Sequence, residues 1–109
     1  MQNLDAIIIK ILQFRDDRDW KQFHNSKDLA LAISIEAAEL NELFLWKESS
    51  DAESFKIKDE LADILIYCIL LAKNHDLDIL TIVEQKLAKN AINYPIDKAK
   101  GIAKKYNEL

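Results

Sequence analysis

The chain is organised around the stretch ELADILIYCILLA, residues 60–72. From Leu61 onward it holds twelve consecutive residues of which only Asp63 is charged. A helix that is apolar on every side is normally buried on every side. Burying an ionised carboxylate without a partner costs several kcal/mol. Asp63 is therefore expected to be neutral, to be paired with a cation, or to bind a metal ion.

The composition indicates one all-α domain over residues 1–109. Half of the residues are hydrophobic, and a single Gly and a single Pro leave few points for sharp turns. Long stretches lack the strict alternation of half-buried strands. Together these features predict helices packed around one modest core.

Charge and cysteine content narrow the partners and the compartment. The formal net charge of −4 argues against a nucleic-acid backbone as the main partner. No segment reaches the roughly 18 apolar residues that span a bilayer, so no membrane insertion is expected. The lone cysteine, Cys68, cannot form an intramolecular disulfide, which predicts a cytoplasmic protein with Cys68 as a core residue.

Four helices are predicted along the chain, at residues 3–17, 26–47, 51–74 and 78–92, with Pro95 beyond the last of them. The first helix carries an apolar stripe formed by Leu4, Ile7, Ile8, Ile11, Leu12 and Phe14. This order of elements predicts a four-helix bundle.

Two pairs of acids lie on helix faces expected to point inward. Apolar residues at 29, 33, 40 and 43 follow a helical stripe whose spacing places Glu36 on the same face. Glu39 follows three residues later, and Glu60 and Asp63 repeat this spacing on the next helix. Two antiparallel helices packed at about 8–10 Å would bring the pairs opposite one another. Four such carboxylates would bind a hard cation, Mg²⁺ or Mn²⁺, that bridges to substrate phosphates.

Two alternatives exist for the acids. The first is that they face solvent or pair with lysines, which the inward stripe disfavours most for Glu36 and Asp63. The second is a di-iron bundle, which needs Glu-x-x-His motifs. Lys21 and Ala72 occupy the Glu positions before His24 and His75, so neither histidine completes that motif.

The acids and their surroundings resemble one known family, the MazG-like all-α nucleoside triphosphate pyrophosphohydrolases, particularly the short dCTP pyrophosphatase-like branch. The resemblance covers almost the whole chain. Its core is E-x-x-E, then 20 residues, then E-x-x-D, formed by Glu36, Glu39, Glu60 and Asp63. The stretches that share it are RDWKQFH, LALAISIEAAEL, LFLWK, DELADILIY, KLAKNAINYP and KKYNEL.

The resemblance implies Mg²⁺-dependent hydrolysis of a nucleoside triphosphate between its α and β phosphates, giving a monophosphate and pyrophosphate. The four acids would hold the metal, and Glu39 is our choice for the proton acceptor. The substrate would be dCTP-like or a modified dNTP in a house-cleaning role. The alternative is a non-catalytic, oligomeric helical module whose acids bind a structural ion.

The resemblance also implies residues that bind the nucleotide. Trp20, Trp46 and Tyr67 would line the base pocket, and His24 of the FH pair would contact it. Lys86, Asn90 and Tyr94, in a K-x-x-x-N-x-x-x-Y-P element, would meet the phosphates. Lys105 and Tyr106 match the tail motif. Both tryptophans could equally be packing anchors, and the histidine could be structural.

Four positions depart from the family pattern. Ile11 stands where some relatives carry a pocket histidine, which removes a polar contact to the base and leaves the preferred base open. Asn93 and Ile102 stand where an Arg and a Ser are usual, so phosphate contacts would be weaker or supplied elsewhere. Asp28 stands where relatives often have Asn.

Self-association is expected, because a chain of 109 residues cannot cover a third helix that is apolar all round. The resemblance implies dimers in which helices of two subunits form the bundle and share parts of one pocket. We predict a homotetramer, with a dimer as the minimum unit.

Overall fold

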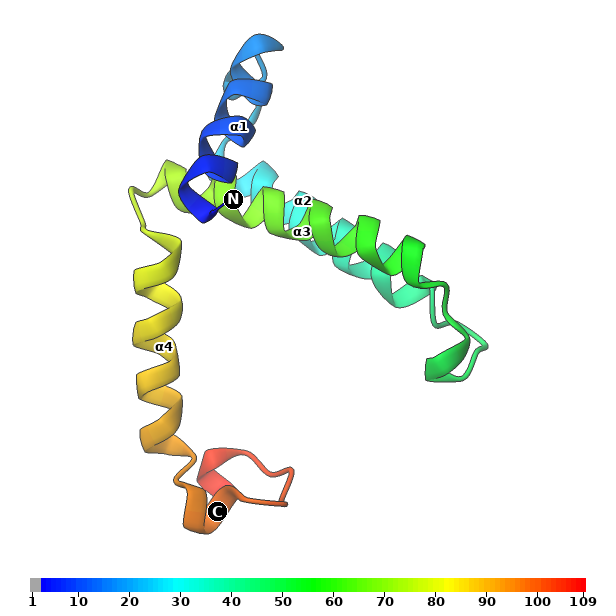
Figure 1. Cartoon of the computed structure of the whole chain (residues 1–109), viewed down its shortest axis with the longest axis vertical. Helices are drawn as coiled ribbons and strands as arrows, with labels where there is room; N and C mark the ends of the chain where they lie inside the picture. Colours follow the sequence, from blue (N-terminus) through cyan, green and yellow to red (C-terminus); the bar gives the residue numbers. More distant parts are fainter. Residues whose placement is uncertain (1–2) are drawn as a thin grey trace. The chain divides into compact units, whose positions relative to one another are not determined.

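The computed structural model describes residues 3–109, and within that range every regular element is helical. The α-helices are α1 (Leu4–Asp17), α2 (Ser26–Glu42), α3 (Ser54–Asn74), α4 (Ile79–Asn93) and α5 (Ile96–Ala99), as Figure 1 shows. There are also three short 3-10 helices: η1 (Lys21–Phe23) and η2 (Ser49–Asp51) lie between α-helices, and η3 (Tyr106–Glu108) follows α5. The all-α prediction is confirmed.

The chain divides into two compact units, one ending at Asp76 and one running from Leu77 to Leu109. The first holds α1, α2 and α3, and the second holds α4, α5 and η3. The single domain over residues 1–109 and the bundle completed by self-association stay predictions.

An antiparallel pair, α2 and α3, forms the centre of the first unit, and α1 contacts α3 (Figure 1). The antiparallel arrangement sets the beginning of α2 against the end of α3. The buried apolar core lies there, formed by Leu29 of α2 with Ile69, Leu70 and Ala72 of α3. The C-terminal half of the apolar stretch is thus the part that the first unit buries.

Two polar contacts fasten the same end of the helix pair. Asn74, at the end of α3, donates from its side-chain nitrogen to the carbonyl oxygen of His24 over 2.8 Å. The hydroxyl of Ser26 and Nε2 of His75 lie 2.9 Å apart. These bonds fix the loop before α2 against the end of α3, and with it the position of His24.

The second helix ends earlier than the sequence predicted. It stops at Glu42 instead of Lys47, and Leu43–Trp46 continue as turns closed by short-range bonds such as Leu45 N to Glu42 O. Trp46 has φ 63°, in the left-handed region that a bulky residue rarely adopts. The chain reverses there, which leaves Trp46 94% exposed.

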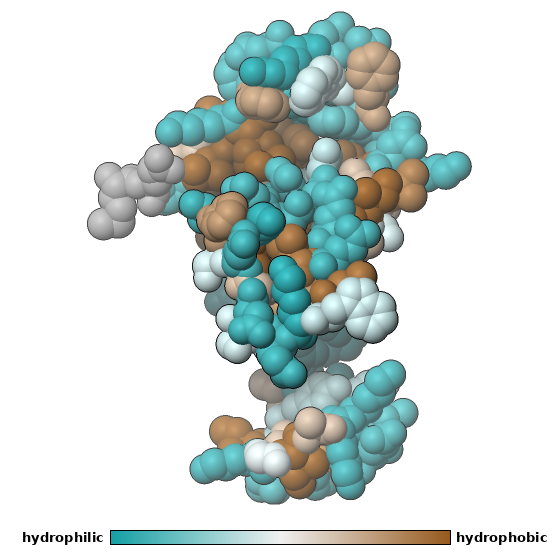
Figure 2. Space-filling view, turned by 90° about the vertical axis from the view of Figure 1, so that its right-hand side faces the viewer, coloured by the Kyte–Doolittle hydropathy of each residue, from teal (hydrophilic) through white to brown (hydrophobic). Residues whose placement is uncertain are grey.

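Large apolar side chains remain exposed on all three helices of the first unit. They include Ile9, Leu31, Ile35, Phe55, Leu61 and Leu65, each at least 46% exposed. Figure 2 shows hydrophobic atoms gathered into continuous areas on one face of the molecule. Within residues 3–109, no helix is long and apolar enough to cross a membrane.

The second unit begins as the sequence predicted. The Asp78 side chain caps α4 by accepting from the backbone N–H of Thr81 over 2.9 Å. The helix ends at Asn93, before Pro95. The rings of Tyr94 and Tyr106 then meet edge to face, 6.2 Å apart, so the tail packs back on the end of α4.

Replacing Leu29 with Ala is expected to lower the free energy of unfolding by about 2–5 kcal/mol, because Leu29 is 1% exposed and its loss leaves a cavity. Urea unfolding followed by circular dichroism measures the change. Lys27→Ala, at an exposed position two residues before Leu29, should stay within about 0.5 kcal/mol of the wild type. Equal effects of the two substitutions would contradict this core assignment.

Candidate metal centre and adjoining pocket

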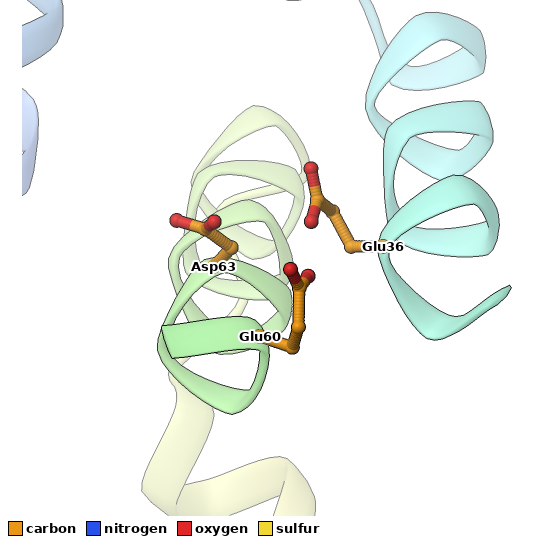
Figure 3. A group of neighbouring side chains, drawn as sticks. All are labelled: Glu36, Glu60 and Asp63. Carbon is orange, nitrogen blue, oxygen red and sulfur yellow. The ribbon is translucent and has the colours of Figure 1, made fainter. Parts of the chain in front are cut away.

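Three carboxylates meet between α2 and α3. Glu36 reaches from α2 toward α3, which carries Glu60 and Asp63 one turn apart (Figure 3). One oxygen from each of the three side chains lies within 4.8 Å of the others. The structure therefore brings together three of the four acids that the sequence pairs singled out.

The three acids repel one another. The nearby Glu60 carboxyl group, then burial, then Glu39 raise the pKa of Glu36 to about 7. The Oε2 atoms of Glu36 and Glu60 are buried without a hydrogen-bond partner. None of the three acids forms an ion pair with a cation within residues 3–109, which disfavours the lysine-paired alternative for them. Glu36 and Glu60 are half-buried, whereas Asp63 is exposed, so the expected burial of Asp63 is not found within the single chain.

Glu39 lies at the edge of this group. Its side chain is exposed, and it is close enough to Glu36 to raise the pKa of that residue. Its carboxylate is outside the set of three that converge within 4.8 Å. The proposed four-acid ligand set stays a prediction, with Glu39 in the place least committed to the shared centre.

The donor set fits a hard divalent cation. Three carboxylate oxygens that converge without a cation offer the ligands that Mg²⁺ and Mn²⁺ prefer. The unpartnered buried oxygens of Glu36 and Glu60 are the atoms that such an ion would satisfy. The acid group could thus hold a metal ion with its remaining coordination positions open.

A pocket of about 540 Å³ adjoins the acids, with Asp63 in its wall. That volume suits a small-molecule ligand. The walls come from α1, the loop that follows it, and α3: Ile7, Lys10, Ile11, Phe14, Arg15, Trp20, His24, Asp63, Ile66, Tyr67 and Leu70. The lining is mainly apolar and aromatic, with a few polar groups.

Two of the polar groups in the wall are held in their neutral forms. Burial, and then the negative charges of Glu36, Asp63 and Glu39, raise the pKa of Tyr67. Burial, and then the positive charge of Arg15, lower the pKa of His24. Tyr67 therefore keeps its phenolic proton, and neutral His24 has one donor and one acceptor nitrogen. Its Nδ1 atom is buried without a partner.

The expected nucleotide-binding residues fall into three places. Trp20, His24 and Tyr67 lie in the pocket wall. Trp46 is not among the residues that line this pocket, and it points into solvent from the turn after α2. The element that is expected to meet phosphates belongs to the second unit, with Lys86 and Asn90 on α4 and Tyr94 as its C-cap.

Sequence reasoning missed the cations of the pocket, Lys10 and Arg15. Arg15 is 8% exposed and its Nε donates to Asp16 over 2.8 Å. It stands four residues after Ile11, so it continues the stripe of the first helix. A basic residue in register with that stripe was the signal that could have revealed it.

Comparisons with known proteins point to one family. The profile of the MazG-like family matches residues 31–109, which span both units. The chain is 36% identical to rat dCTP pyrophosphatase 1 over 105 residues, and 37% identical to the human protein of that name. In each case the match covers 89% of this chain and 62% of the relative, so the chain spans under two thirds of its relatives' length.

A solved structure is similar as well. A pyrophosphatase from Archaeoglobus fulgidus superposes with a TM-score of 0.80 at 34% sequence identity. The match covers 87% of this chain and 94% of the archaeal chain. The resemblance in fold therefore extends over nearly the whole of that protein.

The stability of the metal-free protein should fall as the pH rises from 5 to 8. Folded Glu36 has a pKa of about 7, above its ordinary value of 4.5, so the folded state binds more protons than the unfolded state between these values. The stabilisation is complete below pH 4.5, the ordinary pKa that Glu36 has in the unfolded chain, and it is lost as the pH rises through about 7, the pKa of Glu36 in the folded protein. Urea unfolding with a chelator present measures it.

Glu36→Gln should remove this part of the pH dependence. Its free energy of unfolding should therefore fall less between pH 5 and pH 8 than that of the wild type. Glu42→Gln, at an exposed position on the same helix, is the matched control and should keep the wild-type slope. A Glu36→Gln protein with the wild-type slope would show that Glu36 does not carry the shift.

Proposed function

The chain belongs to the MazG-like family, and on this premise we propose that it is a metal-dependent nucleoside triphosphate pyrophosphohydrolase. Water would hydrolyse the linkage between the α and β phosphates, and monophosphate and pyrophosphate would leave. The observation that carries the proposal is the convergence of Glu36, Glu60 and Asp63 beside a pocket of nucleotide size.

Glu36, Glu60 and Asp63 would hold Mg²⁺, with Mn²⁺ as a substitute. Bound there, the ion would supply neutralisation of phosphate charge and a lowered pKa for the attacking water. Glu39 suits the role of proton acceptor, because it lies beside Glu36 yet outside the converging set. It would take a proton from water without giving up a place in the metal site.

The base would occupy the pocket beyond Asp63. Tyr67 stands one turn after Asp63 on α3, and Trp20 faces the same pocket from the loop after α1. Their rings offer stacking surfaces for a base, and the apolar wall excludes water. The relatives named dCTP pyrophosphatase support a deoxynucleotide substrate, dCTP-like or modified.

Self-association is the second part of the proposal. Leu31 and Ile35 on α2 and Leu61 and Leu65 on α3 are each about half exposed or more, which leaves both helices with uncovered apolar positions. We propose a homo-oligomer, a tetramer with a dimer as its minimum unit.

Trp46 belongs to the same argument. Trp46 is 94% exposed, so its own chain provides almost no packing for this large apolar side chain. Its backbone has a positive φ, a conformation that is costly for a residue with a bulky side chain. In the proposed oligomer Trp46 would contribute to the base pocket of a second copy. Lys86, Asn90 and Tyr94 would meet the phosphates, with Lys105 and Tyr106 of the tail beside them.

Incubation with a panel of dNTPs and modified dNTPs plus Mg²⁺ should release pyrophosphate and a monophosphate. Asp63→Asn and Glu36→Gln should each lower kcat by at least about 100-fold. Loss of a group that only supports a metal ligand costs up to about 100-fold, and loss of a ligand itself should cost at least as much. Both proteins should keep the helical circular dichroism signal and oligomeric state of the wild type. The readout is pyrophosphate, assayed separately from free phosphate.

Glu42→Gln, on the exposed side of α2, should retain the wild-type rate. Near-normal turnover in either acid variant would overturn the metal-site assignment. Absence of product with every nucleotide would instead favour the non-catalytic module with a structural ion.

Size-exclusion chromatography with light scattering should give the mass of at least two chains, and of four for the tetramer. Ile35→Lys combined with Leu65→Lys should shift the protein to a smaller species, because a charge would be buried in the proposed interface. Lys58→Ala, an exposed position on α3, is the control for surface substitution. A wild-type protein that remains monomeric at micromolar concentration would contradict self-association.

A further inference from the structure

The end of α1 turns the chain so that Trp20 reaches the pocket wall. The N–H of Trp20 donates to the carbonyl oxygen of Arg15 over 3.0 Å. The N–H of Asp19 donates to the carbonyl oxygen of Asp16 over the same distance. Asp19 has φ 55°, the left-handed conformation that commonly follows a helix ending with this pair of bonds. The backbone of Trp20 is therefore fixed by the helix that precedes it.

The ring of Trp20 depends on other contacts. It meets the ring of Phe14 edge to face, with centroids 5.8 Å apart, and the ring of His24 at 6.3 Å. Trp20 is still 43% exposed and Phe14 is 52% exposed, so the core encloses neither ring. Ordering a side chain in one rotamer costs conformational entropy, which its neighbours must offset. The orientation of Trp20 therefore depends on the few groups that touch it.

Arg18 is one of those groups. Its guanidinium carbon lies 3.6 Å from the ring centroid of Phe14 and 6.0 Å from that of Trp20. Its Nη1 donates to the carbonyl oxygen of Phe14 over 3.0 Å, which fixes the guanidinium on this part of α1. A planar guanidinium stacks on an aromatic face and is attracted to its π electrons. Arg18, Phe14 and Trp20 thus form one cluster.

Arg18 takes part in the pocket only through its neighbours. Phe14 and Trp20 both line the pocket, and Arg18 is not among the lining residues. Its guanidinium is already engaged by the ring and the carbonyl oxygen of Phe14. Arg18 therefore supports the two aromatic rings from outside the space that a ligand would fill.

We propose that Arg18 is a positioning residue: stacked on Phe14, it holds the Trp20 ring in the wall against which the substrate base stacks. The inference rests on the proposed function, which places a base beside Trp20. Without Arg18 the ring becomes mobile, and ordering it again when a nucleotide binds lowers the affinity. The acids are untouched, so the chemical step keeps its rate.

A double-mutant cycle with Mg²⁺ and dCTP tests whether Arg18 acts through Trp20. Arg18→Ala should raise KM by about 2- to 5-fold, the effect of losing a cation–π contact at an exposed site, and leave kcat unchanged. Trp20→Ala should raise KM by at least about fivefold, because the stacking surface is lost. In the Trp20→Ala background, Arg18→Ala should have no further effect on KM.

Lys21→Ala is the matched control for the loss of a positive charge. Lys21 is exposed in the same loop, lies outside the pocket wall, and makes no cation–π contact within residues 3–109. Its KM should equal that of the wild type. Urea unfolding checks each protein, and Trp20→Leu replaces Trp20→Ala if the latter does not fold. A rise in KM from Arg18→Ala that persists without the Trp20 ring would overturn the inference.

NMR of the ¹⁵N-labelled indoles separates this inference from the proposed activity, because it needs no nucleotide. The chain has two tryptophans, and Trp46→Phe assigns their indole N–H signals. In Arg18→Ala the heteronuclear NOE of the Trp20 indole should fall, since the ring gains fast motion, and that of Trp46 should stay the same. Lys21→Ala should change neither. An unchanged Trp20 value in Arg18→Ala would overturn the inference, whether or not dCTP is hydrolysed.

Discussion

Repulsion among carboxylates that face one another across two helices is the constraint on which the rest of this structure depends. The Glu60 carboxyl group, burial and Glu39 raise the pKa of Glu36 to about 7, and no cation of the described chain forms an ion pair with the converging acids. Carboxylates that were free to move would separate. Here the antiparallel packing of α2 and α3 holds them together, so packing energy maintains an arrangement that a divalent cation would stabilise.

The packing that holds the acids also builds the pocket. Leu29 and the end of α3 form the core, and the bonds of Asn74 and His75 fasten the loop that precedes α2. That loop carries Trp20 and His24 into the wall opposite α3. The helix α3 therefore serves all three parts of the unit. It carries Glu60 and Asp63 of the acid group, Tyr67 in the pocket wall, and the core residues near its C-terminal end.

Much of this could be predicted from sequence. Helical periodicity and the three-residue spacing of the acids identified the helix pair and the three acids that converge, Glu36, Glu60 and Asp63, because both depend on local geometry. Glu39, the fourth acid of the pattern, lies outside that set. Trp46 could not be placed, since its exposure follows from an early end to α2 and a positive φ. Arg15 was overlooked, although its spacing from Ile11 places it on the apolar stripe of the first helix, because charged residues are seldom buried.

The acid centre can be tested directly by Mn²⁺ binding, measured by calorimetry at pH 6.5 in two buffers of different ionisation enthalpy. Because the pKa of Glu36 is about 7, the metal-free protein carries a proton there that the ion must displace. We expect one Mn²⁺ ion to bind for each group of Glu36, Glu60 and Asp63, and most of one proton to be released on binding. In Glu36→Gln this proton release should be lost. Absence of binding, or binding without proton release, would contradict it.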